Sequence, residues 1–186
     1  MRQLFLILFL ISGAACAQKV DTVAAYQALQ TAERLAKAGK YDSCITYYQQ
    51  AAEGYKAYAE GLPKKKKWDV ARLKGWEGYL RARVQAGWNM AQAGKNDTAL
   101  ALLEPTLAEA QYRLGAKHRL LVRISNRIGF IYKGRGQYEE ASAYYHKAMD
   151  IQIETLGPKH PEWVSIYGNL GRSEEHTSEL QSRQYL

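Results

Sequence analysis

The sequence predicts an all-α fold in which antiparallel helix pairs stack into a solenoid. Turn glycines recur along the chain, each followed five positions later by a small residue: Gly39 by Cys44, Gly94 by Ala99, and Gly136 by Ala141. A second segment, Leu114 to His118, recurs 42 residues later as Leu156 to His160, and the same spacing separates Gly94 from Gly136. Self-similarity at a period of this length is typical of helical repeat proteins.

Packing explains why such a pattern recurs. Two helices joined by a short turn cannot bury their apolar faces alone, so neighbouring pairs must cover one another. Small residues let helix axes approach closely, and larger side chains fill the space beside them. The small residues expected at the close approaches are Gly87, Ala99, Gly129, Ala141 and Ala148. The larger residues expected beside them are Tyr47, Tyr48, Leu103, Tyr144 and Tyr145.

Three complete helix pairs and the start of a fourth are predicted within residues 21–171. Their limits follow from the apolar periodicity and from the turn glycines. The pairs are 21–62 (helices 23–38 and 41–59), 68–115 (helices 68–93 and 97–114), 117–157 (helices 118–135 and 138–156), and a partial fourth pair at 161–171.

In the first pair, Gly39 stands where the first helix must end in a left-handed residue, a conformation that glycine adopts without steric cost. Cys44 occupies the small-residue position that follows, so we expect a buried thiol. The chain has two cysteines. If Cys16 leaves with the leader described below, Cys44 has no partner for an intrachain disulfide.

The segment from Gly61 to Trp68 interrupts the repeat. The first two turn glycines are 55 residues apart and the next two are 42 apart. Pro63 disfavours a continuous helix here, so we predict a loop or lengthened flanking helices. The run Lys64 to Lys67 is typical either of a solvated loop or of a contact with an acidic partner, and we expect no nucleic acid as a partner.

The second pair departs most from the pattern, whereas the third follows it closely. Asn96 and Thr106 stand where the repeat has a tyrosine and an alanine. Pro105 falls inside the second helix of this pair and removes a backbone donor, so we expect a kink or an interruption. After the third pair, Gly157 and Pro158 should end the last helix.

The segment from Ile128 to Met149 resembles the consensus of the tetratricopeptide repeat (TPR) family. It has a small residue and an aromatic in its first helix, the turn Gly136-Gln137-Tyr138, and alanines with paired aromatics in its second helix. The resemblance covers residues 24–171 and implies a right-handed superhelical solenoid. The segment from Leu156 to Pro161 also resembles the linker in the long repeats of kinesin light chains.

The N-terminus resembles a secretory signal peptide spanning residues 1–17. A charged start precedes the apolar run 4–11, which is short for a bilayer span and ends in small residues. Cleavage after Ala17 fits the small-x-small rule, so we expect an exported protein, periplasmic or secreted, without a transmembrane helix after cleavage. The alternative is a lipoprotein anchored at Cys16, although Gly13 stands where a branched apolar residue is usual.

The C-terminal residues 172–186 are interpreted as an artefactual tail. The string from Arg172 to Arg183 resembles the translation of a common sequencing-library adapter. The natural chain would then continue beyond Gly171, where the fourth repeat lacks its second helix. A natural polar tail is the alternative.

Residues that could carry catalysis are scattered through the repeats. His118, His146 and His160 lie far apart, and no carboxylate accompanies them at metal-ligand spacing. Gly134-Arg135-Gly136 is a helix terminus rather than a phosphate-binding loop. Ser125 and Ser142 have no evident base and orienting acid. We therefore expect no metal, no cofactor and no enzymatic activity in this stretch.

A binding surface is the stronger hypothesis. The first helices of TPR arrays line a concave groove, and the repeat register places cations and aromatics there. These would hold an extended acidic or C-terminal peptide by charge-assisted hydrogen bonds and stacking, and the net charge of +8 favours an acidic partner. The alternative is a merely solvated face, and the lysine and asparagine clamp of chaperone-tail-binding TPR domains is not reproduced. The predicted groove residues are Arg81, Trp88, Arg123, Asn126, Arg127, Phe130 and Lys133.

The predicted function is that of an exported, non-catalytic scaffold for protein-protein interaction. The alternative is the N-terminal regulatory array of a larger protein. Signal-bearing bacterial proteins with such repeats are often followed by a caspase-like CHAT peptidase domain or by a membrane segment and a signalling module. That second hypothesis follows from the family resemblance alone.

Overall fold

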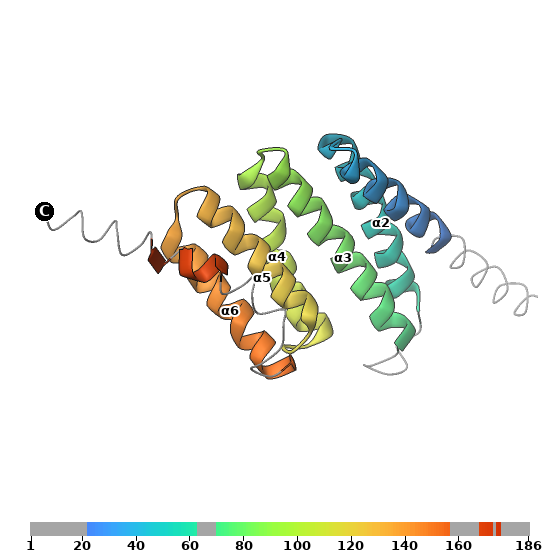
Figure 1. The fold of residues 1–186 in the computed structure, drawn as a ribbon. Helices are drawn as coiled ribbons and strands as arrows, with labels where there is room; N and C mark the ends of the chain where they lie inside the picture. Colours follow the sequence, from blue (N-terminus) through green and yellow to red (C-terminus); the bar gives the residue numbers. More distant parts are fainter. Residues whose placement is uncertain (1–21, 63–69, 157–167, 173, 176–186) are drawn as a thin grey trace, which may run out of the picture. The chain divides into compact units, whose positions relative to one another are not determined.

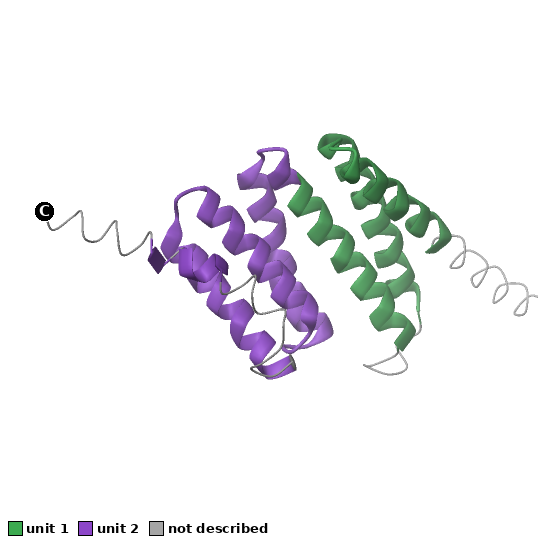
Figure 2. Ribbon diagram, in the orientation of Figure 1, with its two compact units in different colours: residues 1–89 green, residues 90–186 purple. Residues whose placement is uncertain are grey.

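The computed structural model describes residues 22–62, 70–156, 168–172 and 174–175, and every regular element within these ranges is a helix (Figure 1). The chain divides into two compact units, Met1–Asn89 and Met90–Leu186 (Figure 2). Each unit is described by itself below.

The helix bounds agree closely with the sequence prediction. The first helix covers residues 22–37. The helices that follow are α2 (Tyr41–Gly61), α3 (Val70–Gln92), α4 (Asn96–Leu114), α5 (Arg119–Gly134) and α6 (Tyr138–Leu156). The predicted signal peptide, the Pro63 and lysine segment, the Gly157-Pro158 stop and most of the C-terminal tail lie outside the described residues, so those interpretations stay predictions.

Three turns of the same geometry follow the helices that end at the repeat glycines. Each glycine has a positive φ, between 71° and 79°. Its amide donates to the carbonyl three residues earlier, and the next amide donates to the carbonyl five residues earlier, which is the Schellman arrangement. These pairs of bonds are Gly39 to Ala36 with Lys40 to Leu35, Gly94 to Ala91 with Lys95 to Met90, and Gly136 to Lys133 with Gln137 to Tyr132.

The first unit packs α2 closely against α3. A Cβ added at Gly75 would lie 2.8 Å from the Ala59 Cβ, and one added at Gly78 would lie 2.8 Å from the ring of Tyr55. The helices can therefore approach this closely only because α3 carries glycines. Cys44 and Tyr48, nearer the start of α2, are also fully buried, and the buried thiol expected from the repeat register is confirmed.

The second unit repeats this device between α5 and α6, which lie side by side in Figure 1. A Cβ at Gly129 would lie 2.9 Å from the ring of Tyr145 and 3.1 Å from the carbonyl oxygen of Ala141. Tyr145 and Ala141 are fully buried and form a cluster with Leu170. The predicted close approach at Gly129 is confirmed.

The predicted interruption at Pro105 is absent, because α4 continues through this residue from Asn96 to Leu114. Proline frees the carbonyl four residues earlier, here that of Ala101, and Pro105 and Ala101 are both exposed. Water can satisfy the freed carbonyl. Thr106, which takes the alanine position, is fully buried and its hydroxyl donates to the Leu102 carbonyl at 2.6 Å.

The expectation that Tyr47 fills the core is wrong. Tyr48 is 1% exposed and Tyr145 is fully buried, whereas Tyr47 remains 38% exposed. Adjacent residues on a helix point about 100° apart, so one member of an aromatic pair faces the core and its neighbour lies at the edge. The partly buried Tyr144 shows the same asymmetry beside Tyr145.

Candidate interaction surface

The five predicted groove residues of α5 share one face of that helix. Arg123, Asn126, Arg127, Phe130 and Lys133 follow one another at intervals of three or four residues or stand side by side, and all are exposed or half-buried. The opposite face is buried through Leu121, Ile124, Ile128 and Ile131. The amphipathic pattern of α5 therefore fixes which side chains meet the solvent.

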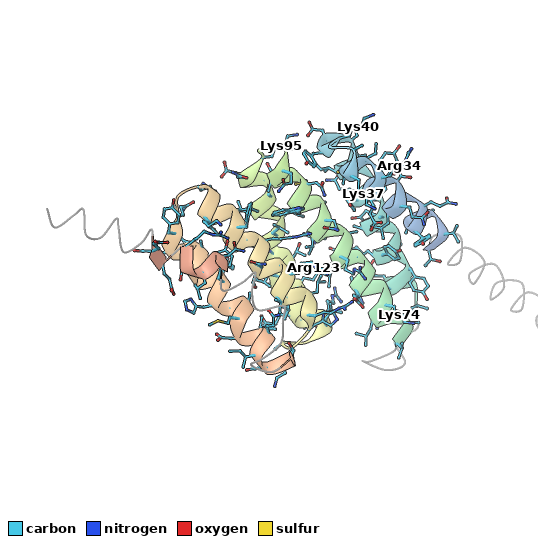
Figure 3. All side chains as sticks on the ribbon, viewed as in Figure 1. Arg34, Lys37, Lys40, Lys74, Lys95 and Arg123 are labelled. Atoms are coloured by element: carbon cyan, nitrogen blue, oxygen red, sulfur yellow. The ribbon has the colours of Figure 1, made fainter. Side chains whose placement is uncertain are left out.

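This α5 face is strongly basic. The sequence of α5 has no aspartate or glutamate, and it carries three arginines four residues apart, Arg119, Arg123 and Arg127. Such a spacing along a helix is a step of about 6 Å between neighbouring arginines. Arg119 was missed by the prediction, although its four-residue interval to Arg123 would have placed it on the face. In Figure 3 the labelled Arg123 projects from α5.

At the C-terminal end of the α5 face, an asparagine from the segment 168–172 links two predicted residues. The Asn169 amide donates to Asn126 Oδ1 at 3.5 Å, and its Oδ1 accepts from Lys133 Nζ at 3.5 Å and from Arg172 at 3.2 Å. The prediction did not include Asn169. Asn169 stands 42 residues after Arg127, so the repeat spacing would have identified it.

Phe130 and Lys133 form a cation-π pair at this same end. The Lys133 Nζ lies 5.3 Å from the centroid of the Phe130 ring, and that ring is 43% exposed. Burial lowers the pKa of Lys133 below its ordinary value, and the charge of Arg172 lowers it further. An aromatic ring beside a partly desolvated ammonium group is suited to an anionic or aromatic ligand group.

The other two predicted groove residues lie in the first unit, on α3. Arg81 and Trp88 are seven residues apart and therefore lie on the same side of that helix. Arg81 pairs with Glu77 at 4.0 Å on the surface. The seven predicted residues thus lie in two units, and a single groove formed by all of them stays a prediction.

A polar contact behind the α5 face joins it to both neighbouring helices. The hydroxyls of Tyr132 and Tyr144 donate to the same oxygen of Glu104, at 2.7 Å and 3.2 Å, and the two rings stack with centroids 5.6 Å apart. The hydrogen bond to Glu104, followed by burial, raises the pKa of Tyr132 to about 12. This contact ties α4, α5 and α6 together and holds α5 in position.

Two histidines, His118 and His146, lie within the described residues. His118 caps α5, since its Nδ1 accepts from the Leu120 amide at 3.2 Å. His146 contacts Ser142 one turn earlier on α6. Across the residues that the structure describes, no three His, Cys, Asp or Glu side chains come together as a metal site would require.

Comparison with known proteins agrees with this architecture. Residues 120–182 match the family model described as the tetratricopeptide repeat. Residues 120–182 therefore carry a tetratricopeptide repeat match. A search of curated protein sequences gave no match.

Solved structures of TPR proteins share the fold. One is the crystal structure of nearly identical TPR-like repeats from a Podosopora anserina protein described as a kinesin light chain, with TM-score 0.59 and 20% identity over 84% of this chain and 68% of that chain. Another is BtubC (BKLC) from P. vanneervenii, with TM-score 0.53 and 18% identity over 84% of this chain and 65% of that chain. At these identities the likeness establishes the all-α TPR fold.

A TPR fold is a scaffold for protein-protein interaction, and protein partners follow from it. In the part of the chain that the structure describes, no helix is both long enough and apolar enough to cross a bilayer.

Proposed function

We propose that this chain is an exported, non-catalytic TPR scaffold whose α5 face binds an extended acidic segment of a partner protein. The observation that carries the proposal is the acid-free helix α5 with its arginines at Arg119, Arg123 and Arg127. Carboxylates accept strong, charge-assisted hydrogen bonds from guanidinium groups, so a row of arginines favours an acidic ligand.

The spacing of the arginines favours an extended rather than a helical ligand backbone. Alternate side chains of an extended chain point the same way and are roughly 6.6–6.8 Å apart. The arginines of α5 are about 6 Å apart. Acidic residues at every second position of an extended peptide would therefore meet successive arginines.

The two ends of the α5 face offer different chemistry to such a peptide. Arg119 and Arg123 provide charged guanidinium donors, whereas Asn126 and Asn169 provide neutral amide groups that can pair with a peptide backbone. The exposed Phe130 ring lies beyond them under Lys133. A partner segment with alternating acids followed by an aromatic or apolar residue fits this order.

The test begins with peptides selected against the purified chain from a random display library. Affinity for the selected peptide is then compared between Arg123→Glu and Lys147→Glu, a matched charge reversal on the exposed side of α6. We expect Arg123→Glu to weaken binding by at least tenfold, since loss of one partner of a charge pair that becomes buried and hydrogen-bonded at an interface costs about 2 kcal/mol or more. Equal affinities of the two variants for the peptide would show that the α5 face does not bind it.

Export is the second part of the proposal and is tested separately. The motivating observation is the apolar run from Leu4 to Ile11 with small residues before Ala17. We expect an N-terminal sequence beginning at Gln18 in protein recovered from the periplasm or the medium. A lipid-modified Cys16 in the membrane fraction would support the lipoprotein alternative instead, and an intact Met1 in the cytoplasm would contradict both.

A larger regulatory protein is the alternative function, favoured by one packing observation. Leu170, within the helical segment 168–172, is 6% exposed and packs on the Tyr145 and Ala141 cluster of α6, as the first helix of a following repeat would. Long-read sequencing of the genomic locus through the codon for Gly171 decides the matter. A reading frame that continues into more repeats and a peptidase or signalling domain supports the alternative, and a stop codon after Leu186 contradicts it.

A further inference from the structure

The first half of α5 carries two exposed arginines, Arg119 and Arg123. Within the ranges that the structure describes, neither of them forms an ion pair. Arg135, just beyond the end of the same helix, in contrast pairs with Asp97 at 2.9 Å. The guanidinium groups of Arg119 and Arg123 are therefore available to an anion from outside the chain.

Two acids of the second unit that could neutralise these arginines pair with other cations. Glu154, in the last turn of α6, pairs at 3.4 Å with Lys117, which lies two residues before Arg119. Glu109, in the second half of α4, pairs with Arg113 at 3.5 Å. The sequence of α5 itself contains no aspartate or glutamate.

The remaining acids of α6 lie away from the start of α5. Asp150 is on the side of α6 opposite the buried Ala148 and Gln152. Glu139 and Glu140 belong to the first turn of α6, which follows the turn at the far end of α5. Charge complementarity to an external anion is therefore retained at Arg119 and Arg123.

The two arginines are spaced so that they can reach one group. They are four residues apart on the same side of α5, a step of about 6 Å along the helix. Like charges at this spacing destabilise a helix, and an anion held between them removes that cost. A ligand group that contacts both guanidinium groups is therefore favoured over one that contacts a single arginine.

We propose that the first half of α5 binds a phosphorylated side chain of the partner segment, held between Arg119 and Arg123. This inference rests on the proposed function, because the phosphate anchors the same peptide on the same α5 face. A carboxylate carries one charge, whereas a phosphate monoester carries about −1.5 to −2 at neutral pH. Its three free oxygens can accept hydrogen bonds from two guanidinium groups at once.

The geometry of α5 also relates the phosphate to the aromatic or apolar residue expected at Phe130. Position 121, midway between the two arginines, precedes Phe130 by nine residues, or about 14 Å along the helix. An extended peptide covers this length in about four residues. The partner segment should therefore carry its phosphorylated residue about four positions from its aromatic or apolar one.

The test uses the acidic peptide selected against the purified chain. Serine replacements first identify the acidic position of the peptide that contributes most to binding. The peptide is then synthesised with glutamate or phosphoserine at that position, and the affinities are compared by fluorescence anisotropy. We expect the phosphoserine form to bind at least about tenfold more tightly, because it gains charge-assisted hydrogen bonds to both arginines.

The variant Arg119→Gln/Arg123→Gln should reduce this preference for phosphoserine to less than about threefold. The control Arg113→Gln/Arg135→Gln removes the same charge at two arginines that have ion-pair partners, and it should retain the preference. Circular dichroism establishes that both variants are folded before their affinities are compared.

The outcomes separate this inference from the proposed function. If both peptides bind equally well and both depend on Arg123, the phosphate site is wrong and the acidic-peptide scaffold stands. A preference for phosphoserine that persists in Arg119→Gln/Arg123→Gln would also overturn the phosphate site. If neither peptide loses affinity in Arg123→Glu, the α5 face does not bind them, and the proposed function fails together with the inference.

Discussion

The two units each contain a tyrosine ring packed against a helix glycine, and the two contacts differ in burial. In the second unit, Tyr145 lies on Gly129 and is fully buried. In the first unit, Tyr55 lies on Gly78 and is only half-buried. Burial raises the pKa of Tyr145 to about 12, and it also raises that of Tyr55, where the nearby charge of Arg81 opposes the rise.

In both units a tyrosine ring packs on a helix glycine. The Tyr145 contact lies in the core of its unit, whereas the Tyr55 contact lies at the boundary with solvent. Tyr145 shares its cluster with Ala141 and Leu170, so its ring has no free space to enter. Because Tyr55 is only half-buried, we expect its ring to shift toward solvent if its neighbour grows. A glycine therefore allows close approach in both units, but only in the second unit should the contact dominate stability.

Removal of the ring should have the largest effect. We expect Tyr145→Ala to lower the free energy of unfolding by about 3–5 kcal/mol, since it leaves a cavity in a fully buried cluster. Tyr55→Ala should cost about half of that or less, because part of its ring is already in water. Urea denaturation followed by circular dichroism measures both, and equal losses would contradict the comparison.

Addition of a methyl group at the glycines should have the next largest effect. Gly129→Ala would place a Cβ 2.9 Å from a ring that cannot move, and we expect a loss of about 1–3 kcal/mol. Gly78→Ala should cost less, since the Tyr55 ring can shift.

Gly134→Ala is the matched control in α5, with no atom within 4 Å of its Cβ. It should be neutral or stabilising by up to about 1 kcal/mol, through helix propensity alone. A loss at Gly134 as large as that at Gly129 would show that the ring contact is not the cause.

Removal of single hydroxyls should distinguish the polar contacts of the second unit. Tyr132→Phe removes the 2.7 Å bond to Glu104 and should cost about 1–2 kcal/mol. Tyr145→Phe should be neutral or slightly stabilising, because its buried hydroxyl has no partner among the described residues. Tyr112→Phe, at a side chain that is 81% exposed, is the control and should change nothing. Thermal unfolding measures all three, and a large loss in Tyr145→Phe would mean that its hydroxyl is bonded.

Alkaline pH should weaken the second unit. The pKa values of Tyr132 and Tyr145 are about 12 in the folded chain and about 10 when unfolded, so the unfolded chain releases protons first as pH rises. The stabilisation from these two groups is complete below pH 10 and is lost as the pH rises from 10 toward 12. The double variant Tyr132→Phe/Tyr145→Phe should show a shallower decline across this window. If stability declines equally in the double variant and in the unaltered chain, groups other than these two tyrosines cause the sensitivity to alkaline pH.

Local pattern was sufficient to predict most of the fold. The turn glycines set the helix ends to within a few residues, because a positive φ at Gly39, Gly94 and Gly136 is a property of the residue and its two flanking helices. The helical period likewise placed Arg123, Arg127 and Phe130 on one face of α5. The intact helix at Pro105 could not be predicted, since it depends on the exposure of the freed carbonyl.

Contacts between helices were less accessible to prediction. Glu104 meets Tyr132 and Tyr144 across 28 and 40 residues of sequence, and no local signal reports such a distance. Gly75 and Gly78 lie outside the small-residue positions of the repeat, so their contacts with α2 were missed. Asn169, in contrast, was within reach, because the repeat spacing relates it to Arg127.

The most direct test of the proposed scaffold is nuclear magnetic resonance mapping of a selected acidic peptide on the ¹⁵N-labelled chain. We predict that the amide shifts on titration are largest along α5 from Arg119 to Lys133, with a response at Asn169. Shifts confined to the outer side of α4 or α6, for example around Tyr112 or Ile153, would contradict the assignment of the α5 face as the binding surface.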